Sequence, residues 1–204
     1  DLYCVFLYRV HTACKHLDSV LRHAPSAKLV FDTVDLHYLR EERQAILANS
    51  DTDLLAAQHT KNAEFHVMRN ANATIVLSHA EKEILQAEDE SLNVFTIPLL
   101  LETPGSTTGF SSRKDIVFIG GFLHQPNVDC LLYFVADIWP AITERVADMR
   151  LIVIGSNPPK EILALGKNDR KIEVVGFVED LDPYFDSCRL SIAPLRYGAG
   201  IKGK

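Results

Sequence analysis

The pattern of apolar residues predicts a chain of strands that alternate with helices. Short, continuous apolar runs are typical of strands that helices cover on both faces of a parallel sheet. Such runs predict strands at residues 2–10, 28–34, 73–77, 94–97, 115–119, 151–154, 172–175 and 190–193. Between them, apolar residues recur with the period of a helix. This period predicts helices at residues 11–23, at 38–72 with a break at 49–51, after Ser78, after Pro126, at 161–165 and at 182–186.

Two of these helices carry sharper signals. Ser78 is followed three residues later by Glu81, which is the pattern of a capping box at the start of a helix. Pro126 suits the first turn of the second helix, because its ring already has a helical φ. In that helix, the residues expected on one apolar face are Val128, Leu131, Leu132, Val135 and Ile138.

The alternation of strands and helices predicts an α/β fold. Successive strand-helix-strand units form parallel sheets with right-handed crossovers. Residues 102–113 (ETPGSTTGFSSR) are rich in Gly, Ser, Thr and Pro, a composition that is typical of linkers. The chain has 204 residues, which fits two small domains. We therefore expect two α/β units, at residues 1–107 and 108–204.

Composition and charge exclude several classes of protein. A net charge of -6 argues against non-specific binding of nucleic acid, which needs a basic surface. No apolar run approaches the ~18 residues of a membrane-spanning helix, and no secretory signal peptide is visible. The 4 cysteines are scattered and form no C-x-x-C pair, which indicates reduced thiols in a cytoplasmic protein and not a metal site. The chain starts without Met and stops just after a glycine-rich segment, so we expect a piece of a longer protein.

The expected ligand sites lie where the strands end. In open parallel sheets, ligands bind beyond the carboxyl ends of the strands. That rule selects residues 32–37, 120–127, 155–159, 176–181 and 194–204. Gly120 and Gly121 let the backbone approach a ligand closely, and the helix that follows offers free N–H groups to an anion. A plain tight turn is the alternative for this glycine pair.

Two further segments carry candidate chemistry. Residues 198–204 (GAGIKGK) combine glycines with lysines after Arg196, and backbone donors with fixed positive charge suit a diphosphate. The spacing is not that of a Walker A loop, and a solvated basic loop is the alternative. His37 follows an apolar strand and Asp35. It suits a hydrogen bond to a sugar hydroxyl or polarisation of a reacting group, and a polar residue at a helix start is the alternative.

Together these segments resemble group 1 (family 4) retaining glycosyltransferases, which have the GT-B fold. The nucleotide-sugar-binding domain of that family is similar to residues 116–142 (IVFIGGFLHQPNVDCLLYFVADIWPAI), 151–159 (LIVIGSNPP) and 172–204 (IEVVGFVEDLDPYFDSCRLSIAPLRYGAGIKGK). Residues 29–43 and 61–85 resemble the end of its acceptor-side domain. The resemblance implies two Rossmann-like parallel-sheet domains of GT-B type, each incomplete in this chain. Residues 1–107 would be the C-terminal part of the acceptor-side domain, and residues 108–204 the N-terminal part of the nucleotide-sugar-binding domain.

The resemblance also implies an activity. It implies transfer of a sugar from a nucleoside diphosphate sugar to a glycan or lipid-linked acceptor, with retained configuration and without a metal or other cofactor. His37 would be the catalytic residue that meets the donor sugar. The implied donor-binding residues are Gly120, Gly121, Arg196, Gly198, Gly200, Lys202 and Lys204 at the diphosphate, Gly176, Phe177, Val178 and Asp180 at the base, and His124 and Asn127 in the cleft. The implied setting is bacterial surface polysaccharide synthesis (O-antigen, lipopolysaccharide or capsule), in the cytoplasm with peripheral contact to the inner membrane.

The chain departs from the family pattern near the phosphate site. Many members have an Arg after the first-strand glycine and a Lys in the next loop, where this chain has Phe122 and residues 125–127. The family has two glutamates seven residues apart, but Ala199 stands at the first position and the second would follow Lys204. We therefore expect the 204-residue chain alone to be inactive. The alternatives are a GT-B-fold nucleotide-sugar epimerase, for which no carboxylate pair is placed, and a non-catalytic nucleotide-sugar or partner-binding protein.

Overall fold

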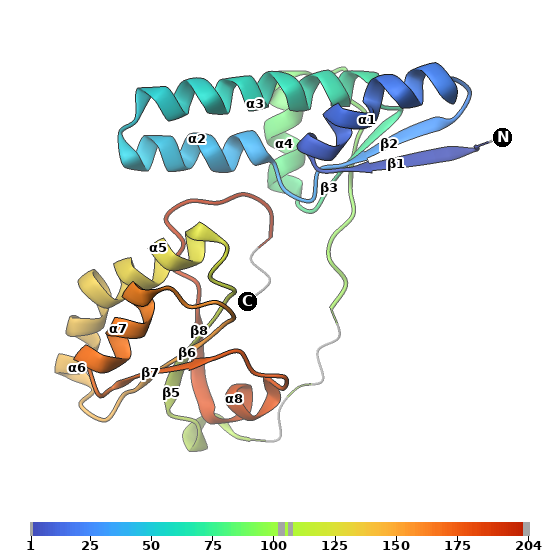
Figure 1. Cartoon of the computed structure of the whole chain (residues 1–204). Coiled ribbons are helices and arrows are strands. Elements are labelled where there is room, and N and C mark those ends of the chain that lie inside the picture. Colours follow the sequence, from blue (N-terminus) through green and yellow to red (C-terminus); the bar gives the residue numbers. More distant parts are fainter. Residues whose placement is uncertain (1, 102–104, 106–107, 202–204) are drawn as a thin grey trace. The chain divides into compact units, whose positions relative to one another are not determined.

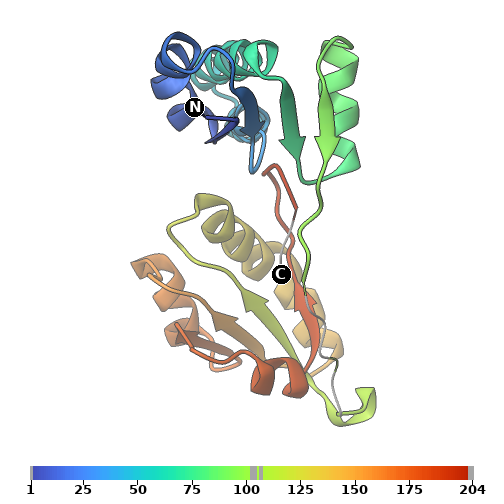
Figure 2. The same cartoon turned by 90° about the vertical axis from the view of Figure 1, so that its right-hand side faces the viewer.

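The computed structural model describes residues 2–101, 105 and 108–201. The chain divides into two compact units, residues 1–101 with Tyr197–Ile201, and residues 102–196 with 202–204. Each unit contains one parallel sheet with its helices (Figures 1 and 2). The boundary expected between residues 107 and 108 borders positions outside the described ranges, and it stays a prediction. None of the helices in the described ranges is long and apolar enough to cross a membrane.

The sheet of the first unit has four parallel strands in the order β1-β2-β3-β4. The strands are β1 (Cys4–Tyr8), β2 (Lys28–Asp32), β3 (Ala73–Val76) and β4 (Val94–Thr96), and the helices are α1 (Val10–His23), α2 (His37–Ala48), α3 (Asp51–Asn70) and α4 (His79–Glu88). Each strand pairs with the next one in the sequence, with helices in every connection. The predicted alternation is confirmed here, and Leu17, Phe31 and Leu85 are buried at the centre of the core.

The predicted break between two helices is also confirmed. Asn49 ends α2 in the left-handed conformation, with a φ of 52°, which Asn tolerates better than most residues. Ser50 then caps α3, because its hydroxyl accepts the backbone N–H of Asp53 at 3.3 Å. Helices α2 and α3 therefore fold back on one another as an antiparallel pair (Figure 1).

The sheet of the second unit has the strand order β7-β6-β5-β8, again all parallel. The strands are β5 (Asp115–Ile119), β6 (Leu151–Ile154), β7 (Ile172–Gly176) and β8 (Cys188–Ile192), and the helices are α5 (Gln125–Tyr133), α6 (Trp139–Arg145), α7 (Lys160–Asn168) and α8 (Asp182–Ser187), with a 3-10 turn η1 (Phe110–Ser112). The strands progress from β5 to β7 in one direction, and the chain then crosses to the other side of β5. Ligands of such sheets bind beyond the carboxyl ends of the strands, near this reversal.

The helix that Pro126 opens differs from the prediction in its second half. A π-helical turn (Phe134–Ile138) separates α5 from α6. The extra residue per turn rotates the apolar face, so Phe134 and Trp139 are buried while Val135 and Ile138 are half-buried. The predicted residues Val135 and Ile138 do pack against the core of this unit. The prediction missed Phe134 and Trp139, because a strict helical period cannot anticipate a π-turn.

Candidate active site

A hollow of about 230 Å³ opens at the carboxyl ends of β5, β6 and β7 in the second unit. Its lining residues are Ile119, Gly120, Gly121, Ile154, Gly155, Ser156, Phe177, Val178 and Leu181. The structure thus brings together four of the residues predicted to bind the donor, namely Gly120, Gly121, Phe177 and Val178. Glycine backbone and apolar side chains make up most of the lining, and such surfaces accept flat, partly apolar groups such as a nucleobase.

Gly155 determines the shape of this hollow. A Cβ atom on Gly155 would lie 2.0 Å from the carbonyl oxygen of Gly120 and 3.1 Å from the Phe122 ring. The two turns lie this close because Gly120 N–H donates to the Ile154 carbonyl at 2.9 Å, and Phe122 N–H to the Ser156 carbonyl at 3.0 Å. Sequence reasoning placed residues 155–159 at a strand end but did not single out Gly155. The sequence signal that could have identified Gly155 is a glycine directly after a buried apolar strand.

The predicted base-binding residues surround the end of β7. Gly176 has a φ of +87°, which favours glycine, and its carbonyl accepts the Gly155 N–H at 2.8 Å. The side chain of Phe177 is 72% exposed, although it borders the hollow. Asp180 has a local role, because its carboxylate accepts the N–H of Asp182 at 2.9 Å at the start of α8. Contact of these residues with a base stays a prediction.

Asn127 and His124 lie at the start of α5. Asn127 is buried, and its side-chain amide donates to the Gly121 carbonyl at 2.7 Å. This bond holds the glycine turn against the helix. His124 is the exposed N-cap residue of α5. Neither geometry requires a ligand, so the role of both residues in donor binding stays a prediction.

Arg196 is paired within the second unit. Its guanidinium forms a two-pronged ion pair with Asp129 on α5, in which Nε lies 3.0 Å from Oδ2. The same guanidinium lies over the ring of Tyr133, at 5.1 Å from its centroid. Its positive charge is therefore largely balanced by Asp129 in this structure. Lys202 and Lys204, the other cations expected at the diphosphate, lie outside the described residues.

In the first unit, His37 is the first residue of α2 and is 5% exposed. Its Nδ1 lies 3.3 Å from Oδ1 of Asp35, without a hydrogen bond of regular geometry. The contact with Asp35 raises the pKa of His37, although burial opposes this. Burial by itself would raise the pKa of Asp35, but His37 and the charges of Arg40 and Arg9 hold it below its ordinary value. The contact therefore favours the protonated form of His37 and the ionised form of Asp35.

This pairing gives a direct prediction for the variant Asp35→Asn. Removal of the carboxylate should lower the pKa of His37, because its largest stabilising contact with the protonated ring disappears. The measurement is the pH titration of the imidazole proton resonances by NMR, with the exposed His23 as an internal reference. An unchanged titration curve for His37 would contradict the assigned contact.

Glu64 completes this cluster, and sequence reasoning missed it. It lies on α3, is 0% exposed, and accepts the backbone N–H groups of His37 and Tyr38 at 3.1 Å each. Burial raises its pKa to about 7, although these two bonds act in the opposite direction. The sequence offered only a weak signal, namely an acidic residue directly before the apolar residues Phe65, Val67 and Met68.

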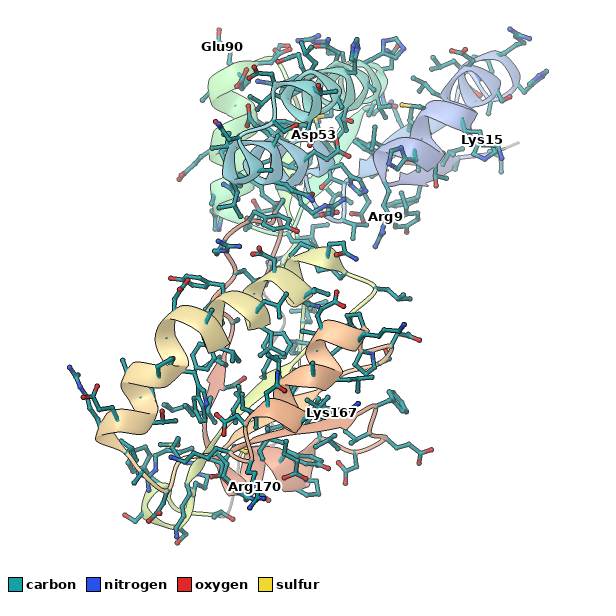
Figure 3. The ribbon with its side chains drawn as sticks, turned by 60° about the vertical axis from the view of Figure 1, so that its left-hand side comes forward. Arg9, Lys15, Asp53, Glu90, Lys167 and Arg170 are labelled. Atoms are coloured by element: carbon teal, nitrogen blue, oxygen red, sulfur yellow. The ribbon has the colours of Figure 1, made fainter. Side chains whose placement is uncertain are left out.

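The backbone next to His37 adopts uncommon conformations. Val34 has a φ of 64°, which is rare for a β-branched residue, and its N–H donates to Asp32 at 3.0 Å. Arg9, at the junction of β1 and α1 (Figure 3), has a φ of 60°. These two positions explain why β1 and β2 end earlier than predicted, at Tyr8 and Asp32. Such strained residues persist only where the surrounding structure fixes them, and they cluster at functional sites.

Residues Tyr197–Ile201 belong to the first unit and include two predicted diphosphate ligands. Gly200 has a φ of +72°, and a Cβ on it would lie 3.1 Å from Cβ of Asp35. Its N–H donates to Glu81 at 3.0 Å, while the Gly198 carbonyl accepts from Arg43 at 2.6 Å. Glu81 also confirms the predicted cap of α4, since its N–H donates to the Ser78 hydroxyl at 3.2 Å. Gly198 and Gly200 thus lie in the same unit as His37.

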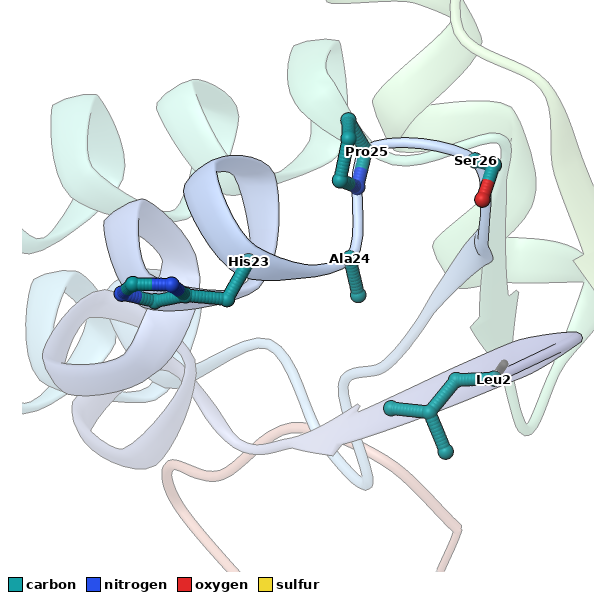
Figure 4. Close-up of a pocket in the computed structure, with 5 residues that line it drawn as sticks. All are labelled: Leu2, His23, Ala24, Pro25 and Ser26. Carbon is teal, nitrogen blue, oxygen red and sulfur yellow. The ribbon is translucent and has the colours of Figure 1, made fainter.

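A second hollow in the first unit lies away from these residues (Figure 4). It measures about 420 Å³ and is lined by Leu2, His23, Ala24, Pro25 and Ser26. It is found where α1 ends and β2 begins, at the amino end of the strand, opposite to the end at which ligands of such sheets bind. Among the described residues, no group of three His, Cys, Asp or Glu side chains is arranged to hold a metal ion.

Comparison with known proteins gives a family match for part of the chain and a set of similar folds. Residues 113–204 match the family model of Glycosyl transferases group 1. No curated protein matches the chain. A solved structure of an S. aureus TarM mutant, in complex with Fondaparinux, alpha-GlcNAc-glycerol and UDP, superposes with a TM-score of 0.64 at 13% identity, over 87% of this chain and 34% of that one.

Two further structures are similar to this chain. A structure of TarM gives a TM-score of 0.60 at 13% identity, over 95% of this chain and 41% of that one. The GtfA/B complex gives 0.55 at 15% identity, over 85% of this chain and 34% of that one. The chain therefore spans less than half the length of each of these proteins, and identities this low show a common fold alone.

Proposed function

We propose that the protein transfers a sugar from a nucleoside diphosphate sugar. This proposal is supported by the match of residues 113–204 to the family model of Glycosyl transferases group 1 and by the similarity of the α/β fold to that of TarM. We propose a glycan or lipid-linked acceptor and retention of the anomeric configuration. The proposed reaction uses no metal or other cofactor. The donor nucleotide is assigned to the second unit, and His37 of the first unit to the transferred sugar.

The observation that carries this proposal is the hollow at the ends of β5, β6 and β7. A leaving diphosphate needs hydrogen-bond donors where negative charge develops. The N–H groups of Gly120 and Asn127 already donate to backbone carbonyls, so we assign this role to the N–H groups of Gly121 and Gln125. The exposed ring of Phe177 at the rim suits stacking on a base. The TarM mutant was crystallised with UDP, so nucleoside diphosphates are the first ligands to test.

The biological setting is part of the same proposal. We assign the activity to bacterial surface polysaccharide synthesis, such as O-antigen, lipopolysaccharide or capsule. The reaction would take place in the cytoplasm, where nucleotide sugars serve as donors. A lipid-linked acceptor would bring the enzyme into peripheral contact with the inner membrane.

One observation favours a second function, that of a non-catalytic nucleotide-sugar or partner-binding protein. The charge of Arg196 is paired with Asp129, so the described part of the second unit does not present this cation to a diphosphate. Ala199 stands where the family has a glutamate. Binding of a nucleotide sugar without transfer by the full-length protein would support this second function.

The test is nucleotide binding by the full-length protein, measured by saturation-transfer NMR without metal. UDP, GDP and ADP and their sugars are compared, and one diphosphate should bind selectively. Phe177→Ala should weaken its binding about tenfold, since stacking of a base on an aromatic ring contributes ~1–3 kcal/mol. The control is Leu163→Ala, which removes a partly exposed apolar side chain on α7 outside the hollow. Absence of binding to any nucleotide in a folded sample would refute the transferase.

A further inference from the structure

The first turn of α2 lacks a cap of its own. The residue at its N-cap position is Leu36, whose apolar side chain accepts no hydrogen bond. Leu36, His37 and Tyr38 are all buried, at 0%, 5% and 2% exposure. The first N–H groups of a helix have no partner within the helix, and water cannot satisfy them where they are buried. The start of α2 therefore requires an acceptor from elsewhere in the fold.

Glu64 supplies that acceptor from the neighbouring helix. Its Oε1 accepts the N–H of His37 and its Oε2 accepts the N–H of Tyr38, each at 3.1 Å. The two residues are 27 and 26 positions away in the sequence, so the bonds form only when α3 packs against α2. Both oxygens of a single carboxyl group are thereby used to fix the first two residues of one helix.

The side chain of His37 is fixed by other contacts. Its Nδ1 lies 3.3 Å from Asp35, and the ring of His11 meets it edge-on with centroids 5.3 Å apart. Asp35 and His11 therefore restrain the imidazole ring, whereas Glu64 restrains the backbone that carries it. If the first turn of α2 unwound, the ring would move even with Asp35 in place.

We propose that Glu64 is a positioning residue for His37. It sets the residue at which α2 begins, and through the peptide groups of His37 and Tyr38 it sets where the imidazole ring lies. Burying an ionised carboxylate is unfavourable, and an apolar side chain would fill the same space without that penalty. A buried carboxyl at this place is explained by the need for a defined helix start under a functional side chain. Its effect on sugar transfer rests on the proposed function, whereas its effect on the geometry of His37 does not.

The test compares Glu64→Gln with Val67→Ala in the full-length protein. Val67 lies one turn further along α3 and is also fully buried, so its truncation destabilises the same helix without removing an acceptor from α2. In Glu64→Gln, one N–H of the pair faces an amide NH2 group and loses its acceptor. We expect hydrogen exchange of the His37 or Tyr38 amide to accelerate at least tenfold and the imidazole resonances of His37 to shift. Val67→Ala should leave these resonances and that exchange unchanged.

Activity provides the second readout. Glu64→Gln should lower kcat about tenfold or more and leave KM for the donor within about twofold, whereas Val67→Ala should preserve kcat at a temperature at which it is folded. Unchanged His37 resonances in Glu64→Gln, or the same shift in Val67→Ala, would overturn the positioning role. If His37 responds as expected but the wild-type protein transfers no sugar, the positioning role stands and the proposed function fails.

Discussion

Gly155→Ala should lower the stability of the second unit by about 3 kcal/mol or more. The new Cβ would lie 2.0 Å from the carbonyl oxygen and 2.8 Å from the carbonyl carbon of Gly120, and these backbone atoms cannot rotate away. The turns after β5 and β6 must separate, which breaks the bond from Gly120 N–H to the Ile154 carbonyl. Overpacking costs about 1–3 kcal/mol and each lost hydrogen bond about 1 kcal/mol more. The second unit has about 100 residues, so the loss corresponds to a fall in the Tm of that unit of about 12–24 °C.

The protein offers its own probe and control for this experiment. The only Trp in the chain is Trp139, which is buried in the core of the second unit, so its fluorescence follows the unfolding of that unit. The matched control is Gly121→Ala, because a Cβ there would meet the Ser156 hydroxyl at 3.4 Å, an ordinary contact. We expect Gly121→Ala to cost less than about 1 kcal/mol. Equal losses in the two variants would show that Gly155 is not the point of closest approach.

The free energy of unfolding of the first unit should fall by on the order of 3 kcal/mol between about pH 4.5 and pH 8. Glu64 has an ordinary pKa of 4.5 and a pKa of about 7 in the folded unit. A raised pKa means that the folded state holds the proton more tightly, so this stability is complete below pH 4.5 and is lost as pH rises through about 7. His37 acts in the same direction, because its pKa is also raised. Asp35 matters only at lower pH. Because its pKa is lowered in the folded unit, it contributes stability above its ordinary pKa of 3.8, and this contribution is lost as pH falls below that value.

Glu64→Gln separates the contribution of Glu64 from that of His37. Gln cannot titrate, so the variant should keep only the smaller pH dependence that His37 causes. Amide hydrogen exchange of buried residues in β2 reports on the first unit, while Trp139 fluorescence reports on the second unit in the same sample. A pH dependence in Glu64→Gln as steep as in the wild type would mean that Glu64 is not the titrating group.

Much of the local structure follows from the sequence because its causes are local. Continuous apolar runs produced the strands of both sheets, and Asn49 and Ser50 end one helix and begin the next within two residues. Ser78 and Glu81 mark a helix start for the same reason, since the bonding groups are three residues apart. The resemblance in residues 116–204 agrees with the family model that matches residues 113–204, because the motifs recur there in a specific order.

The candidate site depends on contacts between residues that are distant in the sequence. Glu64 meets the start of α2 only because α3 folds back along it, and no pattern within either helix records that bond. Gly155 is required only because the turn after β5 lies against it, and the reversal at β5 is a property of the sheet and not of any strand. Gly200 likewise belongs to the first unit because of contacts with residues that are distant in the sequence. The sequence by itself determined the elements, their order and the match of residues 113–204 to a family model. Tertiary packing decided which backbone groups needed partners and which side chains supplied them.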